Sequence, residues 1–319
     1  MSDATTDVPN AIRVSGLNHF YGSRQALRDL NLQIHAGEIF VFLGPNGGGK
    51  TTLFRVLSTL IPCQRGNVSI LGFSLPRDIL EIRRRIGVVF QAPSLDKKLT
   101  VSENICLQAA LYGVGGTLLR DRQQSLMEQL GIAGRADERT ETLSGGLRRR
   151  VELAKGMIHQ PRLLLLDEPS TGLDPGARAD LWRYLQQLRD DSGVSIVMTT
   201  HLLDEAERAD RIAILDRGTM VALDTPDCLR ASIGGDTITI ESDAADSLAA
   251  AIRERFDIGA GVVGGRVRLE HPDASAWVAR IVEAFSVQVR SITLAKPTLE
   301  DVFIQKTGHR FWQEQEGVT

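Results

Sequence analysis

The sequence predicts an α/β chain with a mainly parallel core sheet, followed by a small α+β domain. Three observations support this prediction. A glycine-rich segment, Gly44–Thr52, lies between a short apolar run and a stretch of apolar residues at helical spacing. Further short apolar runs end in polar residues, as buried strands do where an open α/β sheet binds its ligand. The last third of the chain alternates strand and helix patterns, which indicates a separate folding unit.

Composition limits the classes of protein to consider. At 319 residues with 42% hydrophobic side chains, the chain predicts about two domains with a sizeable core. The formal net charge of −3 gives no overall electrostatic reason for nucleic acid to be the main partner. The three cysteines, Cys63, Cys106 and Cys228, are odd in number and lack metal-ligand spacing. They predict reduced thiols in a cytosolic protein.

No segment predicts export or membrane insertion. Residues Met1 to Asn10 are polar and acidic, unlike a secretory signal. No apolar stretch approaches the roughly 20 residues of a spanning helix. Any membrane role is therefore expected to come through a partner.

The first elements form a small β layer. Apolar residues recur at strand spacing in two segments that precede a turn at residues 35–38; they are Ile12, Val14 and Leu17, then Leu30, Leu32 and Ile34. Tyr21 could stack on a purine, and a core or surface aromatic is the alternative interpretation. His19 and His35 lack metal spacing and are interpreted as ordinary surface or turn residues.

The phosphate loop follows the apolar strand Ile39–Leu43. The pattern G-x-x-x-x-G-K-[ST] is met by Gly44, Gly49, Lys50 and Thr51 in a strand-to-helix setting. Glycines let backbone N–H groups approach phosphate oxygens, and the helix N-terminus adds partial positive charge. Lys50 can neutralise the β- and γ-phosphates, and the Thr51 hydroxyl suits Mg²⁺. The helix is expected to run past Leu60 and stop at Pro62, and a glycine-rich turn that binds nothing is the alternative interpretation of the loop.

The next strands are predicted at Val68–Leu71 and Ile86–Phe90. Gln91 follows the second strand and could contact Mg²⁺ or an attacking water. Residues 100–141 predict mainly helix, with a set of apolar core candidates: Ile105, Leu107, Ala109, Leu111, Leu126, Met127 and Leu130. The arginine runs at residues 83–85 and 148–150 are interpreted first as solvated faces.

A second anion site is predicted at Ser144, Gly145 and Gly146. These residues open a helix that runs to about His159, so its first N–H groups are free to bind an anion. A helix cap with no ligand would have the same sequence.

Two further strands end in candidate catalytic residues. Leu163–Leu166 leads into Asp167 and Glu168. Asp167 can hold the Mg²⁺ shell, and Glu168 can accept a proton from, or orient, the attacking water. Beyond the strand Ser195–Thr199, His201 can donate to the γ-phosphate. The alternatives are a solvated turn and a structural histidine.

In order and spacing, these motifs resemble those of the nucleotide-binding subunit of ATP-binding cassette (ABC) transporters over roughly residues 11–230. The resemblance implies an antiparallel β subdomain and a helical subdomain beside the core sheet. It implies that Tyr21 stacks on adenine, that Gln91 is the Q-loop residue, and that Asp174 is the D-loop residue. The nucleotide site it implies consists of Tyr21, Gly44, Asn46, Gly47, Gly48, Gly49, Lys50, Thr51, Thr52, Ser144, Gly145, Gly146 and Asp174. The implied Mg²⁺ ligands are Thr51, Gln91 and Asp167, and the implied catalytic residues are Glu168, His201, Gln91 and Lys50.

Two departures from the family pattern are present. Gly48 stands where the family often has Ala or Ser. Ser144–Gly146 resemble the family's signature motif, and Leu147 replaces the glutamine that usually closes this motif. The second puts only a peripheral contact in doubt.

The resemblance implies an ATPase that uses ATP and Mg²⁺. It implies that two ATP-binding subunits, identical or different, dimerise at the cytoplasmic face of the membrane. There they are expected to bind separate membrane permease subunits and to drive export of a drug, lipid or polysaccharide. The alternative is a cassette ATPase that acts on ribosomes or DNA. It is disfavoured because the chain has one copy of each motif and no sustained heptads. A module that binds nucleotide without turnover is disfavoured because Glu168 and His201 are both present.

The cassette is predicted to span residues 11–232 and an accessory domain residues 233–310. The boundary follows a hairpin at residues 211–223 and a helix start at Thr225-Pro226. The accessory pattern β-α-β-β-α-β predicts a ferredoxin-like fold, with its last strand at Val287–Leu294. The segment Lys296–Phe303 resembles the C-terminal domain of ATPases that serve daunorubicin-type drug-resistance (ABC-2 type) exporters.

Overall fold

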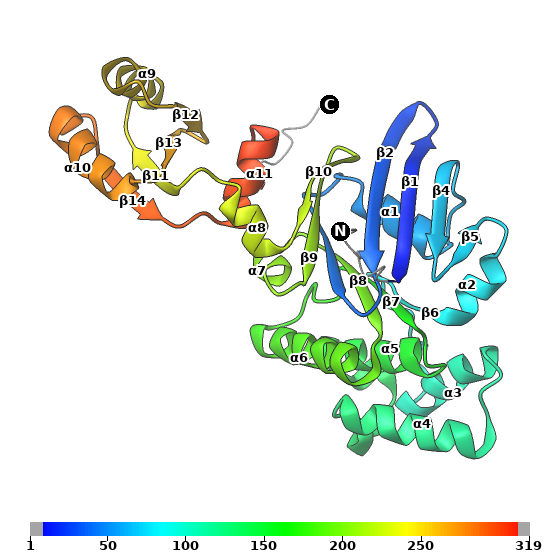
Figure 1. Ribbon diagram of the computed structural model, residues 1–319. Helices are drawn as coiled ribbons and strands as arrows, with labels where there is room; N and C mark the ends of the chain where they lie inside the picture. Colours follow the sequence, from blue (N-terminus) through cyan, green and yellow to red (C-terminus); the bar gives the residue numbers. More distant parts are fainter. Residues whose placement is uncertain (1–8, 312–319) are drawn as a thin grey trace, which may run out of the picture. The chain divides into compact units, whose positions relative to one another are not determined.

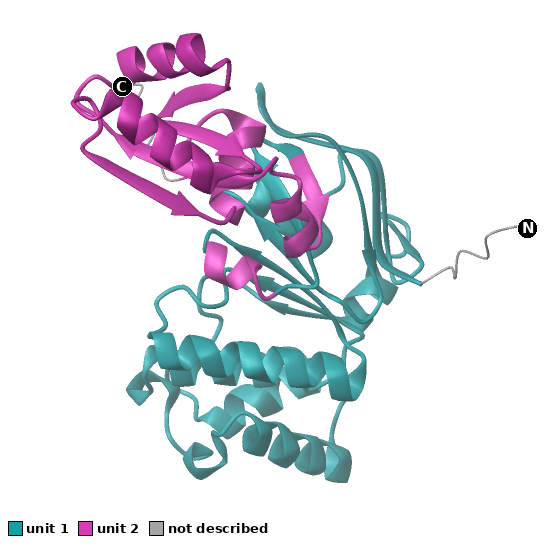
Figure 2. Cartoon of the chain, turned by 60° about the vertical axis from the view of Figure 1, so that its left-hand side comes forward, with its two compact units in different colours: residues 1–202, 209–220 teal, residues 203–208, 221–319 magenta. Residues whose placement is uncertain are grey.

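The computed structural model describes residues 9–311 (Figure 1), and the chain divides into two compact units. The first unit runs to Leu202 and resumes at Ala209–Met220, and the second comprises Leu203–Arg208 and the chain from Val221 onwards (Figure 2). The acidic stretch at residues 1–8 lies outside the described residues. No helix within residues 9–311 combines the length and the apolar composition needed to cross a bilayer.

The first unit opens with the predicted β layer. Its four strands pair antiparallel in the order β2-β1-β4-β5; their bounds are β1 Asn10–Tyr21, β2 Arg24–His35, β4 Arg65–Ile70 and β5 Phe73–Leu75. Alternate residues of β1 are buried, as the spacing predicted. The prediction for His19 was wrong, because its side chain is only 2% exposed inside this layer.

The core sheet has six strands in the order β10-β9-β3-β8-β7-β6. Their bounds are β3 Ile39–Leu43, β6 Ile86–Val89, β7 Leu163–Asp167, β8 Ser195–Thr200, β9 Arg211–Asp216 and β10 Thr219–Asp224. The central pairs are parallel, and β3, β7 and β8 are buried along their whole length. The carboxyl ends of β3, β7 and β8 therefore meet at one edge of the sheet, which is where the predicted site residues follow them.

Helices complete the unit. They are α1 Lys50–Leu57, α2 Ile79–Arg85, α3 Val101–Leu111, α4 Gly116–Gln129, α5 Gly145–Met157 and α6 Pro175–Ser192, with 3₁₀ turns η1 Ala133–Arg135 and η2 Thr140–Thr142. Helices α3, α4 and α5 pack on one another, in the lower part of Figure 1. This packing confirms the predicted helical segment.

Three helix predictions need correction. Helix α1 ends at Leu57 because Thr59 adopts a positive φ, so Pro62 does not stop it and Leu60 is exposed. Leu107 and Leu111 lie on the exposed side of α3, although Ile105 and Ala109 are buried as predicted. The second arginine run is not a solvated face, since Arg149 is buried.

The second unit has the predicted ferredoxin-like order. Its strands are β11 Asp236–Glu241, β12 Ala260–Val263, β13 Arg266–His271 and β14 Ser291–Ala295, and its helices are α7 Leu203–Ala206, α8 Pro226–Ala231, α9 Ala245–Phe256, α10 Ala274–Phe285 and α11 Leu299–Thr307. The antiparallel sheet has the order β12-β13-β11-β14, and α9 and α10 pack with it around a core of Ile238, Ile240, Leu248, Ile252 and Ile281. The last strand begins at Ser291, and Val287 is 97% exposed, so its apolar character did not mark a strand.

The segment Lys296–Phe303 contains the start of helix α11, which packs against α8. Thr225 caps α8 and Pro226 is its first residue, as predicted. The second unit therefore includes α8, whereas the predicted boundary lies just after it, near Ser232. That boundary stays a prediction.

Asp301 ties α11 to the sheet of the second unit. One carboxylate oxygen accepts a hydrogen bond from the Thr298 amide, and the Thr298 hydroxyl accepts one from the Asp301 amide, which forms a capping box. The other oxygen pairs with the Arg268 guanidinium from β13, and both side chains are largely buried.

We expect Asp301→Ala to lower the free energy of unfolding by about 2–4 kcal/mol, because it removes the helix cap and leaves Arg268 without its main carboxylate. Urea unfolding of the full chain, followed by circular dichroism, measures this. Glu300→Ala, one residue earlier in the same helix, is the matched control and should change stability little. Equal unfolding midpoints for the two variants would contradict the role given to Asp301.

Candidate active site

The phosphate loop has the backbone that its glycines require. Gly49 precedes α1 in the left-handed region, with φ of 104°. A Cβ on Gly44 would lie 2.3 Å from the carbonyl oxygen of Leu215, so a larger residue would force the loop away from β9. The loop thus leads directly from the end of β3 into the N-terminus of α1, which presents free N–H groups to an anion.

Lys50 is buried at this loop, with 4% of its surface exposed. Its Nζ donates to the carbonyl oxygens of Gly44, at 2.7 Å, and Pro45, at 3.0 Å. Burial lowers the pKa of Lys50, and the nearby carboxylates of Glu168 and Asp167 oppose this effect. A bound polyphosphate can replace these neutral carbonyl acceptors with charged oxygens. Charged oxygens form stronger hydrogen bonds to the Lys50 ammonium group.

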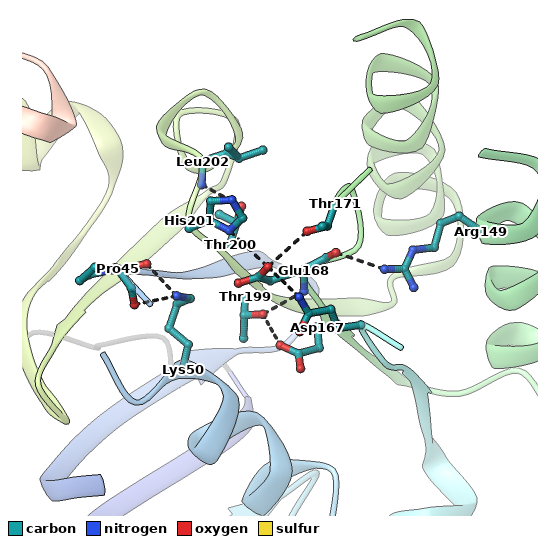
Figure 3. Close-up of polar contacts among 12 residues, drawn as sticks. Pro45, Lys50, Arg149, Asp167, Glu168, Thr171, Thr199, Thr200, His201 and Leu202 are labelled. Carbon is teal, nitrogen blue, oxygen red and sulfur yellow. Dashed lines mark hydrogen bonds and ion pairs between the residues drawn. The ribbon is translucent and has the colours of Figure 1, made fainter. Parts of the chain in front are cut away.

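Asp167 is the last residue of β7 and is bonded to the neighbouring strand. The Thr199 hydroxyl donates to its Oδ1 at 2.6 Å. Burial raises the pKa of Asp167, and this hydrogen bond opposes the rise. The same hydroxyl oxygen accepts from the Glu168 amide at 3.0 Å (Figure 3). One threonine therefore orients both acidic residues.

Three side chains converge on one carboxylate oxygen of Glu168. The amide of Gln91 and the hydroxyl of Thr171 each donate to Oε2 at 3.2 Å. Nδ1 of His201 lies 3.2 Å from the same oxygen. The three groups come from separate parts of the chain, and Figure 3 shows Thr171 and His201 beside Glu168. This arrangement is suited to holding a carboxylate in position for a proton transfer or for orienting water.

The other predicted nucleotide contacts lie on different elements. Tyr21 ends β1 and is 45% exposed, so part of its side chain is accessible to a ligand. Ser144 caps α5, because its hydroxyl accepts from the Leu147 amide, and Asp174 caps α6 in the same way through Ala177. A Cβ on Gly146 would lie 3.3 Å from that of Ala177, so the Ser144 turn and the start of α6 are neighbours.

The structure therefore groups the predicted site residues into two sets. Lys50, Gln91, Asp167, Glu168 and His201 form one centre, and Ser144–Gly146 with Asp174 form a second surface. No hydrogen bond or ion pair of residues 9–311 joins the second surface to the phosphate loop. The role of each residue stays a prediction.

The residues at the first centre fit Mg²⁺ and a polyphosphate. The Thr51 hydroxyl, the Gln91 amide oxygen and the Asp167 carboxylate offer hard oxygen ligands, which Mg²⁺ prefers. Within the described chain, no group of three or more His, Cys, Asp or Glu side chains could hold a metal by itself. This donor set suits an ion that keeps waters and shares substrate phosphates.

Sequence reasoning missed three residues at this centre. Thr199 belongs to a buried strand, where threonine is common for its β-branched shape alone. Thr171 lies in the segment Ser170–Asp174, which contributes to the family resemblance, but no role was predicted for it. Arg149 belongs to an arginine run, and only its spacing of three residues from Glu152, with which it pairs, could have indicated a buried role.

Comparisons with known proteins agree with this geometry. Residues 27–171 match the ABC transporter family, and residues 225–307 match the family described as ATP-binding protein DrrA1-3-like, C-terminal domain. The daunorubicin resistance ATP-binding protein DrrA3 of Streptomyces coeruleorubidus is 37% identical over 93% of this chain and 96% of that protein. A Nod factor export ATP-binding protein I of Cupriavidus pinatubonensis is 35% identical over 90% of this chain and 88% of that protein.

Solved structures give the same result. The cbiO1 subunit of Clostridium perfringens, part of the ABC transporter complex cbiONQ, superposes with a TM-score of 0.66 at 25% identity, covering 78% of this chain and 96% of that one. The dimeric bacterial ABC transporter cassette MJ0796 superposes with a TM-score of 0.62 at 27% identity, covering 67% of this chain and 98% of that one. The resemblance predicted from the cassette motifs and from Lys296–Phe303 is confirmed.

We expect Thr199→Val to lower the rate of Mg-ATP hydrolysis about tenfold or more, as the loss of a hydrogen bond to a charged group does. In the wild type the Thr199 hydrogen bond lowers the pKa of Asp167 and so opposes the effect of burial. Without this bond, the pKa of Asp167 should be higher in the variant than in the wild type. Asp167 must be ionised to bind a cation, so activity should be lost at a higher pH than in the wild type as the pH falls. A pH–rate profile measures both effects. Thr199→Ser keeps the hydroxyl and should retain both the rate and the profile; a wild-type profile for Thr199→Val would refute the assignment.

Proposed function

The chain belongs to the ATP-binding subunits of ABC transporters, and from this premise we propose that it hydrolyses ATP at Glu168 to drive export through separate membrane permease subunits. The observation that carries the proposal is the convergence of Gln91, Thr171 and His201 on Oε2 of Glu168. A carboxylate whose position is fixed beside a phosphate loop is what activation of an attacking water requires.

Each residue of the centre has a distinct task in this proposal. Lys50 exchanges its loop carbonyls for β- and γ-phosphate oxygens. Thr51, Gln91 and Asp167 would hold Mg²⁺, which would supply positive charge to the phosphates. Glu168 orients the attacking water and accepts its proton, while His201 donates to the γ-phosphate.

The second surface is proposed to act on a partner's ATP. Ser144, Gly145 and Gly146 present the free N–H groups of α5, and Asp174 lies beside them. Within residues 9–311 these groups form no hydrogen bond or ion pair with their own phosphate loop. In the proposed dimer two subunits would each complete the other's site, and two ATP molecules would be enclosed. The solved MJ0796 cassette is described as dimeric, which supports this arrangement.

The exported compound is proposed from the relatives. Their printed names concern daunorubicin resistance, linearmycin resistance and Nod factor export. We therefore expect a drug, lipid or polysaccharide-like compound as cargo and a position at the cytoplasmic face of the membrane, held there by the permease. With a net charge of −3, no nucleic-acid partner is expected.

Purification from native membranes should recover a permease, and recovery of ribosomes or DNA in its place would count against the transport role.

Lys50→Ala should abolish measurable ATP hydrolysis and greatly weaken ATP binding, because Lys50 is the side-chain cation of the phosphate loop. Isothermal titration calorimetry measures the affinity. Lys98→Ala, which alters an exposed lysine paired with Glu141, is the matched control and should bind ATP as the wild type does. Wild-type affinity in Lys50→Ala would refute the phosphate-site assignment.

Glu168→Gln should accumulate as an ATP-bound dimer. The amide keeps the size of the side chain but removes the proton acceptor, whose loss costs on the order of 10² to 10⁴ in rate. Light scattering with and without Mg-ATP, on the subunit and on its complex with the permease, measures the association. A Glu168→Gln complex that shows no ATP-dependent closure, beside a wild-type monomer that hydrolyses ATP alone, would exclude the shared site.

A further inference from the structure

Arg149 is the most extensively bonded arginine near the active site. It lies in α5 and is only 7% exposed. Its guanidinium donates to three backbone carbonyls, those of Pro169 at 2.6 Å, Phe90 at 2.8 Å and Glu168 at 3.1 Å. It also donates to the Glu152 carboxylate at 2.9 Å. Only the planar fork of an arginine can serve so many acceptors at once.

The three carbonyls belong to the two segments that carry the active-site side chains. Glu168 has a positive φ of 42°, which is unfavourable for a residue with a Cβ, and Arg149 bonds its carbonyl while Thr199 bonds its amide. Phe90 immediately precedes Gln91. Figure 3 shows the Arg149 side chain reaching from its helix to the backbone at Glu168.

The same face of α5 holds the Gln91 segment at a second residue. Glu152 accepts from the Ser94 amide at 2.7 Å, and Lys155 donates to the Ser94 carbonyl at 2.7 Å. Arg149, Glu152 and Lys155 are spaced three residues apart, so they share one side of the helix. The segment from Phe90 to Ser94 is therefore attached to α5 at both ends.

Helix α5 begins at the Ser144 turn. Arg149 lies five residues further on, a rise of about 7 Å along the helix axis. A displacement of the turn would therefore reach Arg149 through a rigid element, and through it the backbone at Glu168 and Gln91.

We propose that Arg149 is a positioning residue that couples the two ATP sites of the dimer. It links the Ser144 turn, which would contact the partner's ATP, to the backbone of Glu168 and Gln91 in its own subunit. This inference rests on the proposed shared site. Binding of ATP on one side of α5 then favours the productive position of Glu168 on the other. The expected signature is cooperative hydrolysis that depends on the arginine fork.

The test replaces Arg149 by lysine. Arg149→Lys keeps a positive charge beside Glu152 but cannot bond three carbonyls in a plane. Rates are measured against ATP concentration on the protein with its permease, together with ATP affinity by calorimetry. The wild type should have a Hill coefficient above 1, with a limit of about 2 for two sites, and Arg149→Lys should have a Hill coefficient of 1. In this variant kcat should fall about tenfold, while ATP affinity should stay within about twofold of the wild-type value. Arg150→Lys, the next residue, bonds Leu130 and Asp180 only and should keep the wild-type Hill coefficient.

The outcomes separate the coupling from simple support of the fold. If Arg149→Lys does not fold, Arg149→Gln with Glu152→Gln removes both buried charges together and should show the same loss of cooperativity. Unchanged cooperativity in a folded variant overturns the coupling, as does a wild type that hydrolyses ATP with a Hill coefficient of 1. A wild type that does not hydrolyse ATP in any complex overturns the proposed function itself.

Discussion

The backbone of Glu168 adopts a left-handed conformation, and the active site depends on the hydrogen bonds that keep it there. This conformation costs about 1–2 kcal/mol for a residue with a Cβ. The Thr199 hydroxyl accepts from its amide and Arg149 donates to its carbonyl, so the cost is offset by neighbours on both sides. The turn directs the carboxylate toward Gln91, Thr171 and His201. These four side chains follow the ends of the neighbouring strands β6, β7 and β8, which hold them more firmly than loops alone would.

The electrostatics of this centre favour a bound polyanion with its cation over the free state. Burial lowers the pKa of Lys50 and raises that of Asp167, which shows that both charged groups lose hydration in the fold. The lost hydration of Lys50 and of Asp167 is partly compensated by the attraction between their charges and by the hydrogen bonds that each side chain makes. A nucleotide with Mg²⁺ would supply the missing counter-charges, and a ligand that binds only the folded state stabilises it. The residues that cost stability in the free protein are thus those we propose to bind the ligand.

Much of this could be predicted from the sequence, because parallel strands bring their carboxyl ends to one edge. Gln91, Asp167, Glu168 and His201 each follow an apolar run, and their proximity follows from that rule alone. The rule does not identify Thr199 or Arg149, whose roles depend on which neighbour each side chain meets across the sheet. An arginine in a run is solvated by default, and only tertiary packing reverses this for Arg149. Likewise, the apolar pattern could not show that Leu107 and Leu111 are exposed while Ile105 is buried, or that Val287 precedes the last strand.

The proposed mechanism requires that Glu168 act on ATP in a site that the Ser144 turn of a second subunit completes. Glu168→Gln and Ser144→Arg, which are both expected to be inactive, test it when they are co-expressed with different tags and the mixed dimer is purified with its permease. In the mixed dimer one site carries both changes, and the other combines an intact Glu168 with an intact Ser144 from the opposite chain. If the Ser144 turn completes the partner's site, this dimer regains ATP hydrolysis that neither variant shows alone. A mixed dimer that binds ATP but stays as inactive as its parents would contradict it.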